Sequence, residues 1–291
     1  MVVVCYIKAQ MSDYISEMEF SEIYYKYHGK VSGKLEKVRK FVFGPINSRR
    51  LGKSLGVDLV SAKTCSLDCI YCEARATTNL TVTRREYVPV AEVIAELEET
   101  LNEIPPPDYI TFSGAGEPTL NSGIGQVIEF IRKNHPEKRV CLLTNGLLLG
   151  EKQLQEELKN LDLIIPSLDA STEEEYLSIN RPYPGETLEK LLAGLYSFRR
   201  NVPVKMALEI FLVPGINDSE ESLGRFAGLI RQIQPDSIQL NTLDRRGVIN
   251  GLKAVSGKTL ELFASVLGEI APAAVFGPEV EPHIPHSEIV Q

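Results

Sequence analysis

Short apolar runs alternate with amphipathic segments through most of this 291-residue chain, and this alternation predicts the fold class. Six runs have the length and apolar character of buried parallel strands: residues 57–60, 109–112, 140–143, 163–165, 206–211 and 238–240. Apolar residues recur at helical spacing in six further segments: residues 89–101, 124–131, 154–161, 188–198, 223–233 and 260–267. Strands that each lead into a helix predict an α/β fold, a partial (βα)6 TIM barrel that is two units short of a closed barrel.

The least ordinary stretches of sequence follow the ends of these strands. In parallel α/β folds the residues that do chemistry lie on the loops that leave the carboxyl ends of strands. Here those loops carry a cysteine cluster, a Gly-rich stretch and several short polar stretches, at residues 65–72, 113–119, 144–146, 167–169, 213–218 and 241–242. We therefore expect one active site, assembled on one rim of the barrel.

Three cysteines stand within eight residues: Cys65, Cys69 and Cys72. The chain has 5 cysteines, an odd number, and the other two, Cys5 and Cys141, stand alone, which disfavours a disulfide framework. A structural zinc site requires a fourth ligand near by, and none follows in the sequence. Three thiolates leave one coordination position open on a four-coordinate iron–sulfur cluster or metal ion, which is the arrangement of a reactive centre. Cys141, inside an apolar run, is expected to be a buried structural thiol.

Composition is consistent with a cytoplasmic enzyme. Hydrophobic residues make up 43% of the chain and charged residues 24%, enough for a sizeable core. We expect no membrane partner, because no apolar stretch reaches the roughly 18–20 residues of a span, and no signal peptide is recognised at the start. A formal charge of −8 argues against a broadly basic nucleic-acid surface.

The cysteine spacing C-x3-C-x2-C, with the aromatic Tyr71 before the last cysteine, and the later stretch from Gly114 to Pro118 resemble the radical S-adenosylmethionine (SAM) superfamily over roughly residues 40–270. The resemblance implies a [4Fe–4S] cluster on the three cysteines, with SAM bound to the fourth iron. It also implies reductive cleavage of SAM to a 5′-deoxyadenosyl radical, which abstracts hydrogen from a substrate, here unidentified. A one-electron reductant such as flavodoxin or ferredoxin would be a partner.

The resemblance carries over to individual SAM-binding positions. Tyr71 matches the residue that borders the adenine, and Ala115 replaces a glycine of the family's motif. Glu209 is a weaker match. The remaining expected SAM contacts are Gly114, Gly116, Glu117, Asn145, Ser167, Asp169 and Leu240.

Each of these positions also has a structural interpretation. Tyr71 is equally consistent with a core residue, and Asn145 with an ordinary Asn-Gly turn. Asp169 is placed to cap a helix that starts near residue 171.

Two arginine-containing loops are candidates for substrate contact. Arg49 and Arg50 lie among glycines ahead of the first expected strand, either as a solvated basic loop or as a lid for an anionic group. The stretch from Arg50 to Ser54 ends like a P-loop but lacks the leading glycine that the motif requires. Arg181 stands in a loop stiffened by two prolines and is the third candidate.

The stretches at residues 44–72, 167–169, 180–182 and 239–242 are similar to an uncharacterised group of Fe–S oxidoreductases related to the radical SAM enzymes of wybutosine synthesis. Cys5 and Cys141 are too few and too far apart for a second cluster. Within the enzyme class, a protein-activating and an RNA-modifying role stay open. A non-catalytic Fe–S or zinc module is the alternative from another class.

We expect three regions along the chain: an N-terminal extension over residues 1–40, the barrel core over residues 41–270, and a tail over residues 271–291. A helix is expected around residues 14–27. The Pro-rich tail is expected to be a loop or a lid, and His283 and His286 within it are expected to be surface residues rather than metal ligands.

Overall fold

The computed structural model describes residues 39–61, 63–245 and 247–277. Its main feature is an eight-stranded sheet with the strand order β1-β2-β5-β6-β7-β8-β9-β10. Only β1 is antiparallel to its neighbour, and the seven strands from β2 to β10 are parallel. The strands are β1 (Val42–Ser48), β2 (Gly52–Val57), β5 (Tyr109–Phe112), β6 (Arg139–Thr144), β7 (Leu163–Pro166), β8 (Lys205–Phe211), β9 (Ser237–Asn241) and β10 (Ala273–Phe276).

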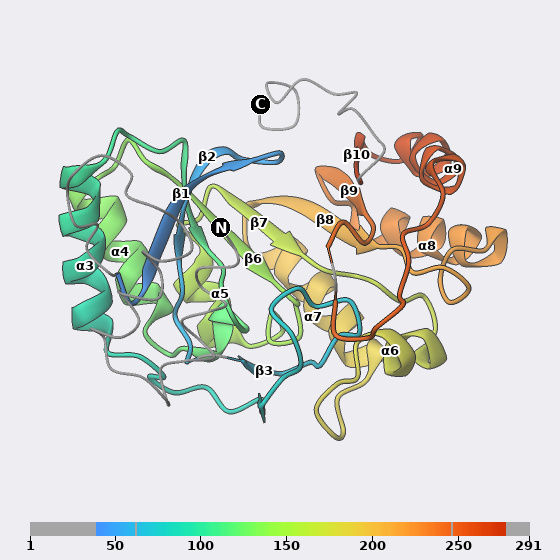
Figure 1. Cartoon of the computed structure of the whole chain (residues 1–291), viewed down its shortest axis with the longest axis horizontal. Helices are drawn as coiled ribbons and strands as arrows, with labels where there is room; N and C mark the ends of the chain where they lie inside the picture. Colours follow the sequence, from blue (N-terminus) through green and yellow to red (C-terminus); the bar gives the residue numbers. More distant parts are fainter. Residues whose placement is uncertain (1–38, 62, 246, 278–291) are drawn as a thin grey trace.

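Helices connect the parallel strands and flank the curled sheet, as Figure 1 shows. They are α3 (Val90–Glu103), α4 (Ile124–Asn134), α5 (Lys152–Leu158), α6 (Glu173–Ile179), α7 (Leu188–Asn201), α8 (Glu220–Ile233) and α9 (Gly257–Gly268). Their buried stripes pack on the sheet: Leu97 of α3, Ile128 of α4 and Phe226 of α8 are almost fully buried. Six β-strand-to-helix units followed by β10 make the partial (βα)6 barrel that the sequence predicts.

Five of the six expected strands are confirmed, and the first is misplaced. The strand spans Gly52–Val57, whereas residues 58–60 belong to the loop that follows it. Asp58 turns the chain there, because its carboxylate accepts a hydrogen bond from the Val60 amide at 3.3 Å. Leu59 and Val60 are buried nonetheless. Their apolar side chains therefore indicate burial in the core and not an extended conformation.

Two strands were missed at the edges of the sheet. Strand β1 contains Gly44 and Pro45, which weaken a strand signal and are tolerated at an edge. Residues from 271 on were expected to form a loop or lid, but β10 pairs in parallel with β9 there. The sheet therefore extends past residue 270, the expected end of the barrel core. The expected helix at 14–27, Cys5, His283 and His286 lie outside the described residues, and the division into three regions stays a prediction.

The β1–β2 hairpin reaches from one edge of the sheet toward the other (Figure 1). At its tip Arg49 donates to the Gly277 carbonyl oxygen at 3.2 Å and pairs with Asp244 at 2.9 Å. Gly277 follows β10 and Asp244 follows β9. The basic loop of the sequence is therefore a hairpin turn that contacts the far edge of the barrel. Its hairpin geometry also excludes the strand-to-helix turn of a P-loop.

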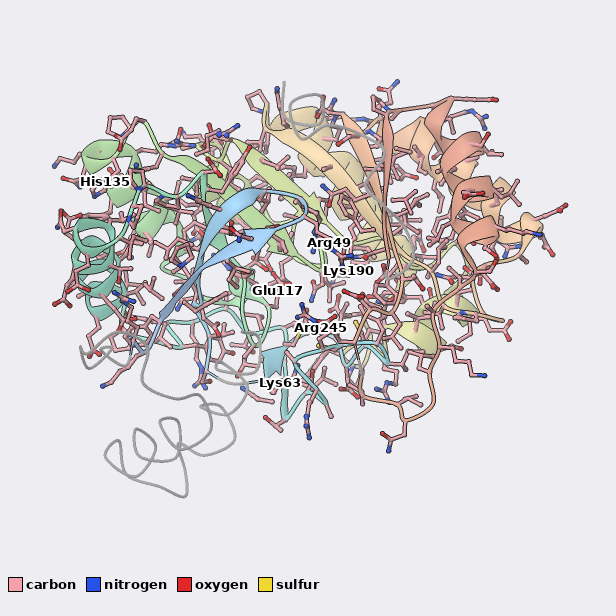
Figure 2. The ribbon with its side chains drawn as sticks, turned by 45° about the horizontal axis from the view of Figure 1, so that its top comes forward. Arg49, Lys63, Glu117, His135, Lys190 and Arg245 are labelled. Atoms are coloured by element: carbon pink, nitrogen blue, oxygen red, sulfur yellow. The ribbon has the colours of Figure 1, made fainter. Side chains whose placement is uncertain are left out.

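Two small elements near the rim complete the fold. A short parallel pair joins β3 (Thr64–Cys65) to β4 (Asn79–Leu80), and the 3-10 helix η1 (Pro118–Leu120) follows β5. Figure 2 shows Glu117 and Arg245 toward the middle of the molecule, with His135 at its periphery. The rim is the edge of the barrel at the carboxyl ends of the parallel strands, and it carries the cysteine cluster and the Gly-rich stretch.

Asn217 fastens the ends of two neighbouring strands. Its side chain is fully buried and donates to the carbonyl oxygens of Asp169 and Phe211, both at 2.8 Å, and accepts from the Val213 amide at 2.7 Å. Buried backbone groups that lose such a partner cost about 1–3 kcal/mol each.

We predict that Asn217→Ala lowers the free energy of unfolding by at least about 2 kcal/mol, because three buried backbone groups lose their partner. Asn134→Ala, at an exposed position where the side chain bonds only within its own helix, should change it by less than about 0.5 kcal/mol. Urea denaturation of both variants measures the difference. Equal small effects would show that Asn217 does not fasten the strand ends.

Candidate active site

The cysteine segment follows β2 and is held by the end of α6 and the residues after it. Backbone hydrogen bonds join the Ile70 amide to the Ile179 carbonyl at 2.9 Å and the Tyr183 amide to the Ser66 carbonyl at 2.9 Å. The Asp68 amide donates to the Asn180 carbonyl at 3.0 Å. The Cys65, Cys69 and Cys72 side chains are thus carried on a segment fixed by its backbone to residues 179–183.

Each of the three sulfur atoms accepts a hydrogen bond from a nitrogen of a different side chain. Asn145 Nδ2 lies 3.6 Å from Cys65 Sγ, Asn180 Nδ2 lies 3.4 Å from Cys69 Sγ, and Lys63 Nζ lies 3.4 Å from Cys72 Sγ. Hydrogen bonds to the sulfurs are among the features that tune iron–sulfur centres. The segment thus presents three thiols with a matched set of donors.

Burial controls the protonation of two of these thiols. It raises the pKa of Cys65 to about 12, with the nearby Glu117 adding to the effect, and raises the pKa of Cys69 well above its usual value. Both groups are therefore protonated at neutral pH when no metal is bound. Thiolate ligation releases those protons, so metal binding and proton release are coupled.

The stretch after β5 packs directly against the cysteine segment. Asp58 Oδ2 accepts from the Ala115 amide at 2.9 Å, the Lys63 amide donates to the Ala115 carbonyl at 3.2 Å, and the Glu117 amide donates to the Thr64 carbonyl at 3.0 Å. Burial raises the pKa of Asp58 to about 6. Gly116 lies so close to Thr64 that a Cβ there would overlap the Thr64 carbonyl oxygen. Close backbone approach explains the glycine at this position.

Glu117 joins the ends of β5 and β6. Its buried carboxylate accepts from the hydroxyls of Thr119 and Thr144, both at 2.7 Å, and from the Asn145 amide at 2.8 Å. It also caps η1 through the Thr119 amide. Burial raises the pKa of Glu117, and these hydrogen bonds offset part of that rise. Its side chain therefore connects the two strand ends at the rim through hydrogen bonds within the protein.

Tyr71 links the cysteine segment to β7 and β8. Its ring stacks on Phe211 with ring centroids 3.8 Å apart, and its hydroxyl donates to Asp169 Oδ2 at 2.5 Å. Asp169 also accepts from Asn180 Nδ2 at 2.9 Å and from the Phe211 amide at 3.0 Å. Burial raises the pKa of Asp169 to about 6. The cap of α6 is Thr172, so the helix-cap interpretation of Asp169 is wrong.

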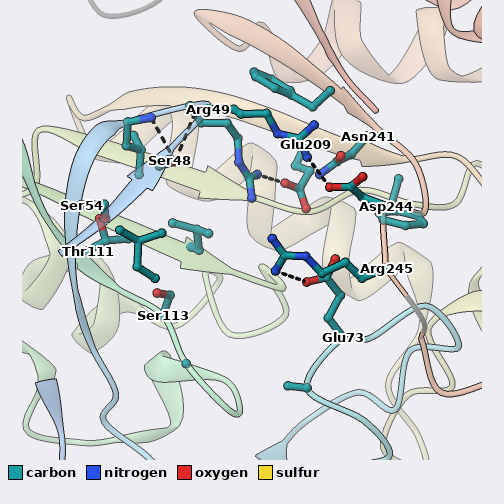
Figure 3. Close-up of a pocket in the computed structure, with 18 of the residues that line it drawn as sticks. Ser48, Arg49, Ser54, Glu73, Thr111, Ser113, Glu209, Asn241, Asp244 and Arg245 are labelled. Carbon is teal, nitrogen blue, oxygen red and sulfur yellow. Dashed lines mark hydrogen bonds and ion pairs between the residues drawn. The ribbon is translucent and has the colours of Figure 1, made fainter. Parts of the chain in front are cut away.

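A pocket of about 490 Å³ opens beside these groups, inside the curve of the sheet (Figure 3). Several of the expected site residues line it: Arg49, Arg50, Tyr71, Cys72, Gly114, Ala115 and Glu209. Ser167 lies at the end of β7 and bridges to Glu209 without lining the pocket, and Leu240 is fully buried in β9. The cysteine segment and the glycine-rich stretch therefore meet at one cavity.

Three arginine–carboxylate pairs surround this pocket (Figure 3). Arg50 pairs with Glu209 and also contacts Gln239, Arg49 pairs with Asp244, and Arg245 lies 3.5 Å from Glu73. The positive and negative charges of these six side chains balance. The wall is mostly apolar, and its charged groups carry no net charge.

Arg181 does not line the pocket. It donates through Nε to the Asp68 carbonyl oxygen at 2.7 Å, and its guanidinium pairs with the Asp68 carboxylate at 3.1 Å. The stiff loop thus aims Arg181 at the cysteine segment, and its role as a substrate contact stays a prediction. Lys63, Asp58 and Phe211 are site residues that the sequence did not single out, because a lone lysine, aspartate or phenylalanine beside a strand carries no recognisable pattern.

Residues 59–227 match the Radical SAM superfamily. The chain belongs to the radical SAM superfamily. UPF0026 proteins of Methanocaldococcus jannaschii and Synechocystis sp. are 32% and 33% identical to it; the alignments cover 78% and 77% of this chain and 72% and 90% of those proteins. A Brachyspira hyodysenteriae protein named GTPase Obg is 40% identical over 80% of this chain, which spans 34% of that relative.

Solved structures show the same fold at low sequence identity. A radical SAM methyltransferase from Sphaerobacter thermophilus superposes with a TM-score of 0.60 at 19% identity, over 77% of this chain and 66% of that one. TYW1 with a lysine-pyruvate adduct bound gives a TM-score of 0.55 at 17% identity, over 75% and 74% of the two chains. The expected relation to wybutosine-synthesis enzymes is confirmed at the level of the fold.

Radical SAM enzymes generally use SAM and an iron–sulfur cluster, and the donor set of this chain fits such a cluster. Three thiols on one segment, each with an N–H donor, supply ligands for three irons. Among the described residues, no three His, Cys, Asp or Glu side chains are grouped to hold a single metal ion, whereas a [4Fe–4S] cluster takes one thiolate on each of three irons. Cys141 is fully buried in β6, as expected. No helix in the described ranges is long and apolar enough to cross a membrane.

We predict that Gly116→Ala strongly impairs SAM binding, because the added methyl group would displace the stretch from the Thr64 carbonyl. Ala115→Gly is the matched change next to it and should keep SAM affinity within about threefold. It adds no atom, and it restores the glycine that Ala115 replaces in the family's motif. Equilibrium binding of SAM to both variants after cluster reconstitution measures this. Comparable loss in both would contradict the close-approach explanation.

Proposed function

We propose that this chain binds a [4Fe–4S] cluster through Cys65, Cys69 and Cys72 and uses it to cleave SAM to a 5′-deoxyadenosyl radical. The observation that carries the proposal is a three-thiol segment packed against the glycine-rich stretch at one pocket. When bound, the cluster supplies the electron that breaks the carbon–sulfur bond of SAM. The radical then abstracts hydrogen from a substrate in the same pocket.

The residues of the pocket have separable roles in this proposal. Gly114 and Ala115 present backbone to the SAM amino group, and the stacked Tyr71 and Phe211 form the aromatic wall for adenine. Asp169, whose carboxylate is engaged by Tyr71 and Asn180, positions Tyr71. The further SAM contacts that we propose are Gly116, Glu117, Asn145, Ser167 and Leu240, acting through backbone or packing.

The charged pairs on the pocket wall favour a polar substrate. Arg49 and Arg50 are each already paired with a carboxylate, so an anionic substrate must exchange with Asp244 or Glu209. That exchange would provide specificity, since an uncharged molecule leaves both pairs intact. The reductant that we propose is a one-electron carrier such as flavodoxin or ferredoxin.

Other assignments receive less support. A non-catalytic cluster carrier has no need of a pocket beside its thiols, yet Cys72 lines one here. The GTPase name of one relative belongs to a protein of which this chain spans 34%. Protein activation and RNA modification use the same chemistry, and the charge-balanced pocket favours neither.

Anaerobic reconstitution tests the proposal. The protein should bind about four irons and four sulfides, and with dithionite and SAM it should form 5′-deoxyadenosine. Cys65→Ala, Cys69→Ala and Cys72→Ala should each abolish product formation and lower the iron content, because a ligand is lost. Cys141→Ala is the control and should keep both, since that thiol is buried in β6. Iron-loaded protein that forms no 5′-deoxyadenosine would overturn the enzymatic proposal.

A further inference from the structure

Lys63 carries an ammonium group in a place where burial is costly. The residue is 9% exposed, and its Nζ contacts the sulfur of Cys72 at 3.4 Å. Within the described ranges, no carboxylate forms an ion pair with this ammonium. A buried charge requires a compensating partner. The Cys72 sulfur is the atom that Nζ contacts, and the charge of Lys63 also acts on the nearby Asp58 carboxylate.

The backbone fixes Lys63 between the two motifs of the site. Its amide donates to the Ala115 carbonyl at 3.2 Å, and its carbonyl accepts from the amides of Thr78 and Asn79, both at 3.1 Å. Its φ is +57°, in the left-handed region that a lysine rarely adopts. An unusual backbone conformation held by three hydrogen bonds places the side chain reproducibly beside Cys72.

The other two donors reach the cysteines from different elements. Asn145 follows β6 and shares its amide hydrogens between Cys65 and Ser66 Oγ, the latter at 2.9 Å. Asn180 follows α6 and shares its amide hydrogens between Cys69 and Asp169. One cation and two neutral amides therefore face the three sulfurs, one donor for each ligand.

We propose that Lys63, Asn145 and Asn180 set the reduction potential of the cluster, with the charge of Lys63 making the largest contribution. This inference rests on the proposed cluster at the three cysteines. Reduction adds one negative charge to the cluster and its thiolates. Hydrogen-bond donors and a nearby positive charge stabilise that reduced state more than the oxidised state, so they raise the potential. Charged donors contribute about twice as much as neutral ones.

The test is a redox titration of the reconstituted protein without SAM, followed by EPR of the reduced cluster. Lys63→Met should lower the ratio of reduced to oxidised cluster at a fixed potential by about tenfold, a shift of about 59 mV for one electron. Lys63→Gln, which removes the charge and keeps an N–H donor, should give an intermediate shift. Asn145→Ala and Asn180→Ala should each shift the potential in the same direction by less than Lys63→Met.

Lys53→Met is the matched control. It removes the same charge from an exposed position near the start of β2, whereas the cysteine segment follows the end of that strand. The reduction potential of the cluster in this variant should equal that of the cluster in the unsubstituted protein. A similar shift in this control would show that net charge, not the contact with Cys72, sets the potential.

The outcomes separate this inference from the proposed function. If the unsubstituted protein does not assemble a cluster, the proposed function fails. If it does, and both Lys63 variants titrate like it, the inference about Lys63 fails while the function stands. If both Lys63 variants lose the cluster although Lys53→Met keeps it, Lys63 acts in assembly, and the inference about the potential is overturned.

Discussion

Backbone hydrogen bonds from the cysteine segment to the end of α6 and the residues after it hold the rest of the site together. They fix Ser66, Asp68 and Ile70 to a part of the chain more than a hundred residues further on. Because the partners are main-chain groups, the position of the cysteines depends on the path of the chain rather than on particular side chains. The chain's own backbone thus forms the rim of the barrel without help from a cofactor.

The pattern of apolar runs was sufficient to predict the barrel. The cysteine spacing, together with the stretch from Gly114 to Pro118, was sufficient to predict the family. Parallel strands buried on both faces read as apolar runs, so β5 to β9 were found within a few residues of their observed bounds. The edge strands were missed because β1 includes a glycine and a proline, and because β10 stands in a proline-rich stretch between Pro272 and Pro278. The first strand was misplaced because Leu59 and Val60 are buried without being extended.

Side-chain partners at the site were the hardest part to foresee. The sequence gives no sign that Asp169 meets Tyr71 and Asn180, or that Arg181 meets Asp68, because these contacts join residues far apart in the chain. Asp169 looked like a helix cap because a helix begins four residues later, at Glu173, yet Thr172 takes the cap position. Spacing identifies ligands of one segment, whereas a site built from six strand ends depends on the packing of those strands.

The missing units of the barrel leave β1 and β10 as two sheet edges without a shared hydrogen-bond ladder. The hairpin tip reaches toward the other edge: Arg49 donates to Gly277 after β10 and pairs with Asp244 after β9, and Arg50 pairs with Glu209 of β8. The first of these pairs is partly exposed, with 46% and 30% of the two side chains accessible, so dissolved salt screens it. Ionic strength thereby becomes a control on how firmly the hairpin tip is held to the far edge of the barrel.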